Sequence, residues 1–135
     1  MFKEKATTAL KGVGFKMTKP RIWIVDFLDG NETHPTAFDI YDEIRRENKG
    51  FSFATVYNTL DALVRSGVVK QIKMDVKSFR FDPKVETHGH FLCKKCHKLY
   101  DVALGANNIS DNIECGQVDE LEIKFYGTCT NCLSN

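Results

Sequence analysis

The residues with the clearest chemistry are two pairs of cysteines in the second half of the chain, Cys93 with Cys96 and Cys129 with Cys132. Each C-x-x-C pair can fold as a tight knuckle that directs two thiolates at one ion, and four thiolates suit a closed, tetrahedral structural zinc site. The 32 residues between the pairs exceed the usual zinc-finger interval, so we expect a strand and a helix to return the chain. A thioredoxin-like redox pair and plain packing of small side chains are the alternatives.

A second group of candidate ligands offers only nitrogen and oxygen. His88 and His90 alternate in the sequence, so in a strand both imidazoles would point from one face and could chelate together. Asp82 and Asp101 lie on either side of them and add carboxylates. Such donors suit a harder, exchangeable divalent ion with an open coordination position, whereas a merely polar strand surface is the alternative.

Three further residues have ligand atoms but weaker signals. Cys115 stands outside both cysteine pairs, and we expect it to be a small buried hydrophobe. His97 follows Cys96 directly, and we expect it to be exposed. His34, in a Thr-His-Pro-Thr segment, is by itself an ordinary loop residue.

The first half of the chain is predicted to contain four helices. They cover residues 6–13, a segment capped by Thr18 and ending near 30, a segment starting at Thr36, and a segment from Ser52 to 67. In the fourth helix Val56, Leu60, Leu63 and Val64 form one apolar stripe, so a small polar face points away from it. That face carries Ala54, Thr55, Asn58 and Arg65, which could enter a DNA major groove or could simply be solvated.

Two alternating runs, residues 68–74 and 78–81, follow these helices and predict a hairpin. Three helices, the last of which could read bases in the DNA groove as a reader helix, followed by a short basic hairpin, form the pattern of a winged helix-turn-helix. Beyond Pro83 we expect short strands near 90–93, 99–102 and 121–126, with a polar stretch of helical character around 107–114. The fold class is therefore α+β, with a domain at 1–82, a hinge at 83–86 and a small α/β domain at 87–135.

Composition is that of an ordinary globular protein, with 42% hydrophobic and 27% charged residues in 135. No stretch approaches a membrane span of roughly 18 apolar residues, and the start lacks an apolar signal core, so a cytoplasmic location is expected. Residues 1–82 hold 14 Lys and Arg against 11 Asp and Glu, a net of +3, and residues 83–135 hold 5 against 7, a net of −2. This asymmetry permits DNA binding by the first half without establishing it.

Taken together, these residues resemble the ferric uptake regulator family, and within it most closely the peroxide-sensing repressors. The matching blocks are His34 to Ala37, Asp39 to Tyr41, Ala54 to Leu60, Arg80 to Asp82, His88 to Cys96, Asp101, and Tyr126 to Cys132. The resemblance implies a homodimeric, metal-dependent transcriptional repressor, not an enzyme, with an N-terminal winged helix that binds a palindromic double-stranded DNA operator and a C-terminal dimerisation domain.

The resemblance also assigns the metals. By position, Cys93, Cys96, Cys129 and Cys132 match the structural zinc ligands, whereas the regulatory iron(II) or manganese(II) site matches His34, Asp82, His88, His90 and Asp101. Aspartate at both carboxylate positions favours a peroxide sensor, in which iron catalyses the oxidation of a ligand histidine; the matching histidines are His34 and His88. A repressor that responds to iron, manganese or zinc level alone is the alternative.

For DNA contact we predict Thr55, Tyr57 and Asn58 in the groove, and Lys16, Thr18 and Arg21 on phosphate or the minor groove. We expect no small organic substrate and no membrane partner. A metalloenzyme with water activated at the His and Asp site is a more remote hypothesis, and a zinc-ribbon scaffold without DNA binding is another.

Overall fold

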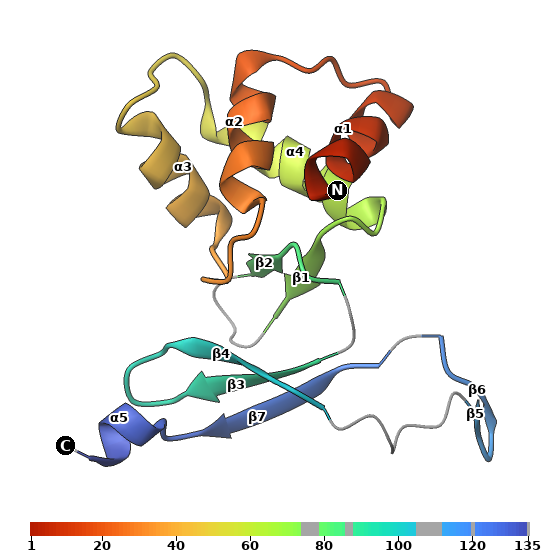
Figure 1. Ribbon diagram of the computed structural model, residues 1–135, viewed down its shortest axis with the longest axis vertical. Helices are drawn as coiled ribbons and strands as arrows, with labels where there is room; N and C mark the ends of the chain where they lie inside the picture. Colours follow the sequence, from red (N-terminus) through yellow and green to blue (C-terminus); the bar gives the residue numbers. More distant parts are fainter. Residues whose placement is uncertain (74–78, 86–87, 105–111, 120, 135) are drawn as a thin grey trace. The chain divides into compact units, whose positions relative to one another are not determined.

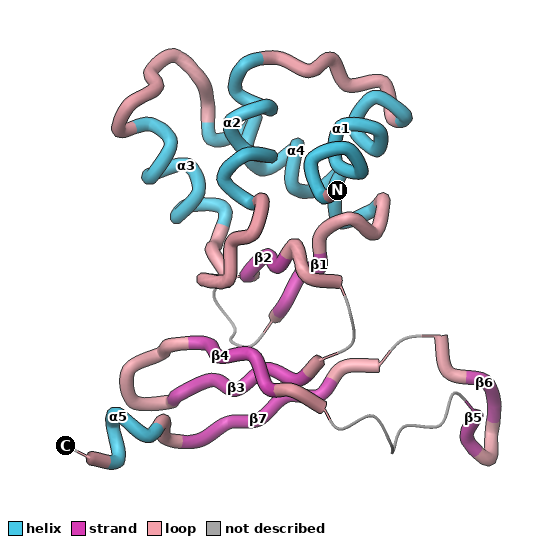
Figure 2. The backbone as a smooth tube through the Cα atoms, viewed as in Figure 1, coloured by secondary structure: helices cyan, strands magenta, loops and turns pink. Residues whose placement is uncertain are grey.

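The computed structural model describes residues 1–73, 79–85, 88–104, 112–119 and 121–134 (Figures 1 and 2). They belong to two compact units, Met1–Val85 and Glu86–Asn135, each of which is described by itself. Among the described residues, every helix is too short or too polar to cross a lipid bilayer.

The first unit contains the four predicted helices. These are α1 (Phe2–Gly12), α2 (Lys19–Leu28), α3 (Ala37–Arg45) and α4 (Phe53–Arg65). Thr18, Thr36 and Ser52 are the N-cap residues, as the sequence predicts. The side chains of Thr36 and Ser52 accept the backbone N–H three residues on, which satisfies one of the unpaired donors at each helix start.

The apolar faces of these helices meet in one core. On α4, Val56, Leu60 and Leu63 are buried as predicted, but Thr59 is fully buried whereas Val64 is only half-buried. The Thr59 hydroxyl donates to the carbonyl of Thr55 at 2.6 Å, so its burial leaves no polar group unsatisfied. The other core side chains are Ala6, Leu10, Ile24, Val25, Leu28, Ile40, Ile44, Ala62, Val69 and Phe81.

A short hairpin completes the first unit. Strand β1 (Lys70–Ile72) pairs antiparallel with β2 (Arg80–Asp82), and Ile72 lies opposite Arg80. The predicted pairing is therefore confirmed, while residues 74–78 between the two strands lie outside the described residues. β2 also forms an isolated antiparallel bridge between Arg80 and Thr36, at the start of α3.

The second unit is built on a three-stranded sheet. Strand β3 (Gly89–Cys93) lies in the centre, antiparallel to β4 (Leu99–Val102) and parallel to β7 (Ile123–Gly127). A separate hairpin joins β5 (Asn112–Ile113) to β6 (Gly116–Gln117), and helix α5 (Thr130–Leu133) follows β7.

Three predictions for this unit need correction. Residues 112–113 are a strand, so the helical character expected there is wrong, whereas residues 107–111 lie outside the described residues. In the described part of the interval between the cysteine pairs, strands return the chain and no helix does. Cys115 is exposed rather than buried, because it lies in the tight β5–β6 turn.

Candidate metal centres

The four paired cysteines come together in the second unit. Cys93 ends β3, opposite Gly127 at the end of the parallel strand β7, and the Lys94 N–H donates to the Gly127 carbonyl at 2.8 Å. The two knuckles therefore leave the sheet at the same end. The four Sγ atoms all lie within 4.8 Å of one another; they belong to Cys93, Cys96, Cys129 and Cys132.

The spacing of these sulfurs fits zinc. A tetrahedral ion with Zn–S bonds of about 2.3 Å requires sulfurs about 3.8 Å apart. The Sγ atoms of Cys96 and Cys129 are 3.8 Å apart. A redox pair would need only one C-x-x-C, whereas here both pairs contribute to one cluster of free thiols. The cluster has the donor set and geometry of a structural zinc site.

Backbone groups prepare Cys93 to be a ligand. Its Sγ accepts the N–H of Cys96 at 3.4 Å and the N–H of Cys129 at 3.3 Å. These hydrogen bonds lower the pKa of Cys93 to about 5, because they stabilise the thiolate, which is the form that binds metal. A hydrogen bond from Tyr100 lowers the pKa of Cys129, while the hydrogen bond with Cys129 raises the pKa of Cys132 to about 12.

The second unit also brings together three nitrogen and oxygen donors. His90 lies opposite Asp101 in the β3–β4 register. Asp101 Oδ1 is 3.0 Å from His88 Nε2 and 3.5 Å from His90 Nε2, and the two imidazole centroids are 4.4 Å apart. Because both imidazoles lie beside the same carboxylate oxygen, the prediction that they face the same way is confirmed, and both histidines are buried. Gly89 between them packs tightly, since a Cβ there would lie 3.2 Å from the Phe125 ring.

The first unit holds the remaining two predicted donors. His34 precedes α3 and Asp82 ends β2, and His34 Nε2 lies 3.4 Å from Asp82 Oδ2. Both side chains are only 2% exposed. The other carboxylate oxygen of Asp82 accepts the Lys84 N–H at 2.9 Å. A buried carboxylate next to an imidazole is a preformed pair of hard donors.

The predicted DNA-contact residues of α4 do not all present free side chains. Tyr57, 55% exposed, and Asn58 both point to the solvent side of the helix. Thr55 is half-buried, and its hydroxyl lies 3.1 Å from the Ser52 hydroxyl within the helix cap. Phe53 is 41% exposed in the first turn of α4, and the sequence interpretation did not include it.

Lys16, Thr18 and Arg21 lie where the chain enters α2. Lys16 and Thr18 are exposed. Arg21 is half-buried, and its Nη1 donates to the Lys16 carbonyl at 2.7 Å while its guanidinium lies 4.6 Å over the Phe15 ring. Arg21 therefore holds the backbone of Lys16 in place.

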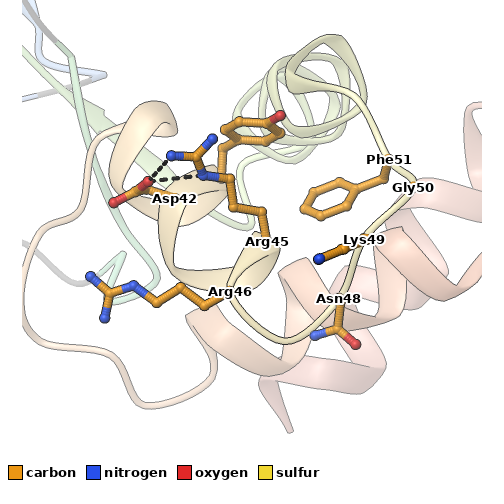
Figure 3. Close-up of a pocket in the computed structure, with 8 residues that line it drawn as sticks. Asp42, Arg45, Arg46, Asn48, Lys49, Gly50 and Phe51 are labelled. Carbon is orange, nitrogen blue, oxygen red and sulfur yellow. Dashed lines mark hydrogen bonds and ion pairs between the residues drawn. The ribbon is translucent and has the colours of Figure 1, made fainter.

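A hollow of about 580 Å³ lies at the end of α3 (Figure 3). Arg45 is bound there to Asp42 through its Nε and Nη2, at 3.0 and 2.8 Å, and Arg46 lies 3.4 Å from Glu43. None of the predicted metal or DNA residues lines this hollow. Its lining consists of Tyr41, Asp42, Arg45, Arg46, Asn48, Lys49, Gly50 and Phe51.

The profile of the ferric uptake regulator family matches residues 12–117. The peroxide-responsive repressor PerR of Staphylococcus saprophyticus is 30% identical over 133 residues, which cover 96% of this chain and 90% of the relative. The solved Campylobacter jejuni peroxide stress regulator has a TM-score of 0.68 at 26% identity, with coverage of 96% of this chain and 93% of that one.

A second solved structure supports the fold. The Helicobacter pylori ferric uptake regulator, described as having three functional metal binding sites, has a TM-score of 0.77 at 22% identity. The similarity covers 99% of this chain and 93% of that one. The predicted α+β fold class is therefore confirmed.

Proposed function

This chain belongs to the ferric uptake regulator family and is a metal-responsive transcriptional repressor, and we propose that it senses peroxide through a ligand histidine. The observation that carries the proposal is the separation of donors. Sulfur donors gather in one cluster of the second unit, separate in kind from the histidine and aspartate donors, which are His34 with Asp82 in the first unit and His88, His90 and Asp101 in the second. The family's members are regulators rather than enzymes, so the prediction of a non-enzyme is confirmed and the metalloenzyme hypothesis is dropped.

The regulatory site in this proposal joins the two groups of hard donors. His34 and Asp82 of the first unit and His88, His90 and Asp101 of the second would hold one iron(II) or manganese(II) ion, which supplies a Lewis-acidic, redox-capable centre when bound. Imidazole and carboxylate are the donors that these ions accept. The ion would fasten both units in one relative orientation, and Cys93, Cys96, Cys129 and Cys132 would hold the structural zinc.

The DNA-binding step would use the exposed face of α4. Tyr57 and Asn58 would meet base edges and Lys16 would meet phosphate or the minor groove, and the exposure of all three side chains supports this. In a homodimer, fixing both reader helices about 34 Å apart would match successive turns of a palindromic operator. To convert repressor molecules that are mostly unable to bind DNA into molecules that mostly can, the metal would have to bind the DNA-competent orientation about 10⁴-fold more tightly than the other. Operator, dimer and cytoplasmic location remain predictions.

Peroxide would act by changing a ligand. In net terms one peroxide inserts an oxygen atom into a C–H bond of the His34 or His88 imidazole and leaves as water, which oxidises the ring by two electrons. The oxidised imidazole would be a poorer ligand for the metal. The two units would then lose their fixed relative orientation, and the DNA would be released. The peroxide-responsive relative and the aspartates at positions 82 and 101 support this route over sensing of metal level alone.

The test is anaerobic operator binding with iron(II), manganese(II) or zinc(II), before and after a brief peroxide pulse. We expect release only in the iron sample, with one added oxygen on peptides containing His34 or His88. Exposed His97, outside both groups of hard donors, is the matched control and should stay unmodified. Iron-dependent DNA binding without oxygen addition at His34 or His88 would assign metal-level sensing instead.

A further inference from the structure

We propose that Arg80 is a positioning residue for the metal ligand His34 and couples the His34–Asp82 pair to the start of α3. The inference rests on the proposed function, because it takes His34 and Asp82 to be ligands of the regulatory metal. It adds a residue that touches no metal and yet sets how well the metal is bound.

His34 has an unusual backbone. Its φ is +55°, in the left-handed region, although it is not glycine and is nearly completely buried. This conformation costs free energy for a residue with a side chain, so surrounding contacts must hold it. The imidazole Nε2 of this residue lies 3.4 Å from Asp82 Oδ2.

Two hydrogen bonds and a bridge join residues 34–36 to β2, far away in the sequence. Arg80 Nη1 donates to the His34 carbonyl at 3.1 Å, across a separation of 46 residues. The Phe81 N–H donates to the Pro35 carbonyl at 2.9 Å, and Thr36 bridges to Arg80. Residues 34–36 therefore lie beside β2 like a short extra strand, with the arginine side chain as an additional clamp.

The hydrogen bond from Arg80 connects β2, the metal ligand His34 and the start of α3. Asp82 follows Arg80 by two residues on the same strand, so the clamp and the second ligand share one rigid element. Thr36 at the other end is the N-cap of α3, in a capping box with Asp39. Helix α3 packs against α4, the proposed reader. A change in the position of His34 would therefore also move the N-cap of α3.

The experiment compares manganese(II) affinity of the full-length, zinc-loaded chain in four forms: wild type, His34→Ala, Arg80→Gln and Arg80→Lys. Manganese binding is followed by electron paramagnetic resonance, and unfolding by the fluorescence of Trp23, which packs edge-on against Phe51 in the first unit. We expect Arg80→Gln to weaken binding by about tenfold to a hundredfold, as for other residues that orient metal ligands. Arg80→Lys keeps one donor and should recover part of this loss. Arg45→Gln, an arginine in the same unit paired to Asp42, is the matched control and should bind like wild type.

The outcomes separate the two proposals. If His34→Ala binds manganese like wild type, the regulatory ligand set fails. If His34→Ala loses binding but Arg80→Gln keeps it, the positioning role of Arg80 is overturned while the ligand set stands. If both Arg80 variants lose affinity only in step with their unfolding, and recover it fully at lower temperature, Arg80 is merely structural and the inference is again overturned.

Discussion

Loss of zinc should unfold the second unit and leave the first unit folded. Among its described residues, the buried apolar side chains other than zinc ligands are Leu92 and Leu99. Burying each contributes roughly 1.5–3 kcal/mol, so about 6 kcal/mol is an upper bound for the pair. Ordering each residue of a chain costs about 1–2 kcal/mol of backbone entropy, whereas structural zinc contributes about 10–16 kcal/mol in small zinc domains. The metal is therefore the larger of these two stabilising contributions.

The perturbation that tests this is Cys96→Ser, since Cys96 is an exposed member of the cluster and its replacement leaves no cavity. Hydrogen exchange should show loss of protection in β3 and β7. The fluorescence transition of Trp23, the only tryptophan, should remain because it belongs to the first unit with its own core. Zinc content, measured by mass spectrometry, should fall in parallel.

The control is Cys115→Ser, which changes another exposed cysteine outside the cluster. It should keep full zinc content and full protection. If Cys96→Ser or a chelated wild type retained slow exchange in β3 and β7 without bound zinc, the small core would suffice and the reasoning from its size would be wrong.

Other substitutions test the remaining proposals. Lys16→Ala should weaken operator and non-operator binding alike and reduce the salt slope of binding by about one unit in titrations at several salt concentrations. Asn58→Ala should cost roughly 1–3 kcal/mol for the operator alone and relax sequence preference in competition assays. Thr36→Ala removes the hydrogen bond that the Asp39 N–H donates to the Thr36 hydroxyl oxygen at 3.0 Å, and it should lower the free energy of unfolding by about 1 kcal/mol in denaturant titrations. An unchanged salt slope, an unchanged preference or an unchanged midpoint would contradict each in turn.

The elements with local signals could be predicted from the sequence. Thr36 is followed by Asp39 at capping-box spacing and Ser52 has an N-cap side chain, so the starts of α3 and α4 follow from short-range rules. Apolar residues recur at helical intervals through α4, which predicts its buried face. The alternation of His88 and His90 similarly predicts one shared face. In each case the physical cause lies within a few residues of its effect.

What the sequence could not show depends on contacts between distant residues. No local pattern indicates that Arg80 reaches the His34 carbonyl, or that Cys93 lies opposite Gly127. For Thr55 a local contact was missed. A residue on the polar face of a helix can also take part in the N-cap, and here the Thr55 hydroxyl lies within hydrogen-bond distance of the hydroxyl of the cap residue Ser52. Cys115 was expected to be buried from its residue type, but its position in a two-residue turn exposes it.

In the proposed function, the distribution of donors would let one chain keep one metal permanently and exchange another. All four sulfurs belong to the second unit, so zinc binding is part of that unit's folding. Among the proposed ligands in the described residues, the first unit would offer the regulatory ion two donors and the second unit three, too few alone to fill the shell of a divalent ion that prefers about six. In the proposed mechanism, the free energy gained when both groups bind the same ion would be available only in one relative orientation of the units, and that difference would convert metal occupancy into DNA affinity. A short connection such as the expected hinge at 83–86 would keep the second group at high effective concentration once the first had bound the ion.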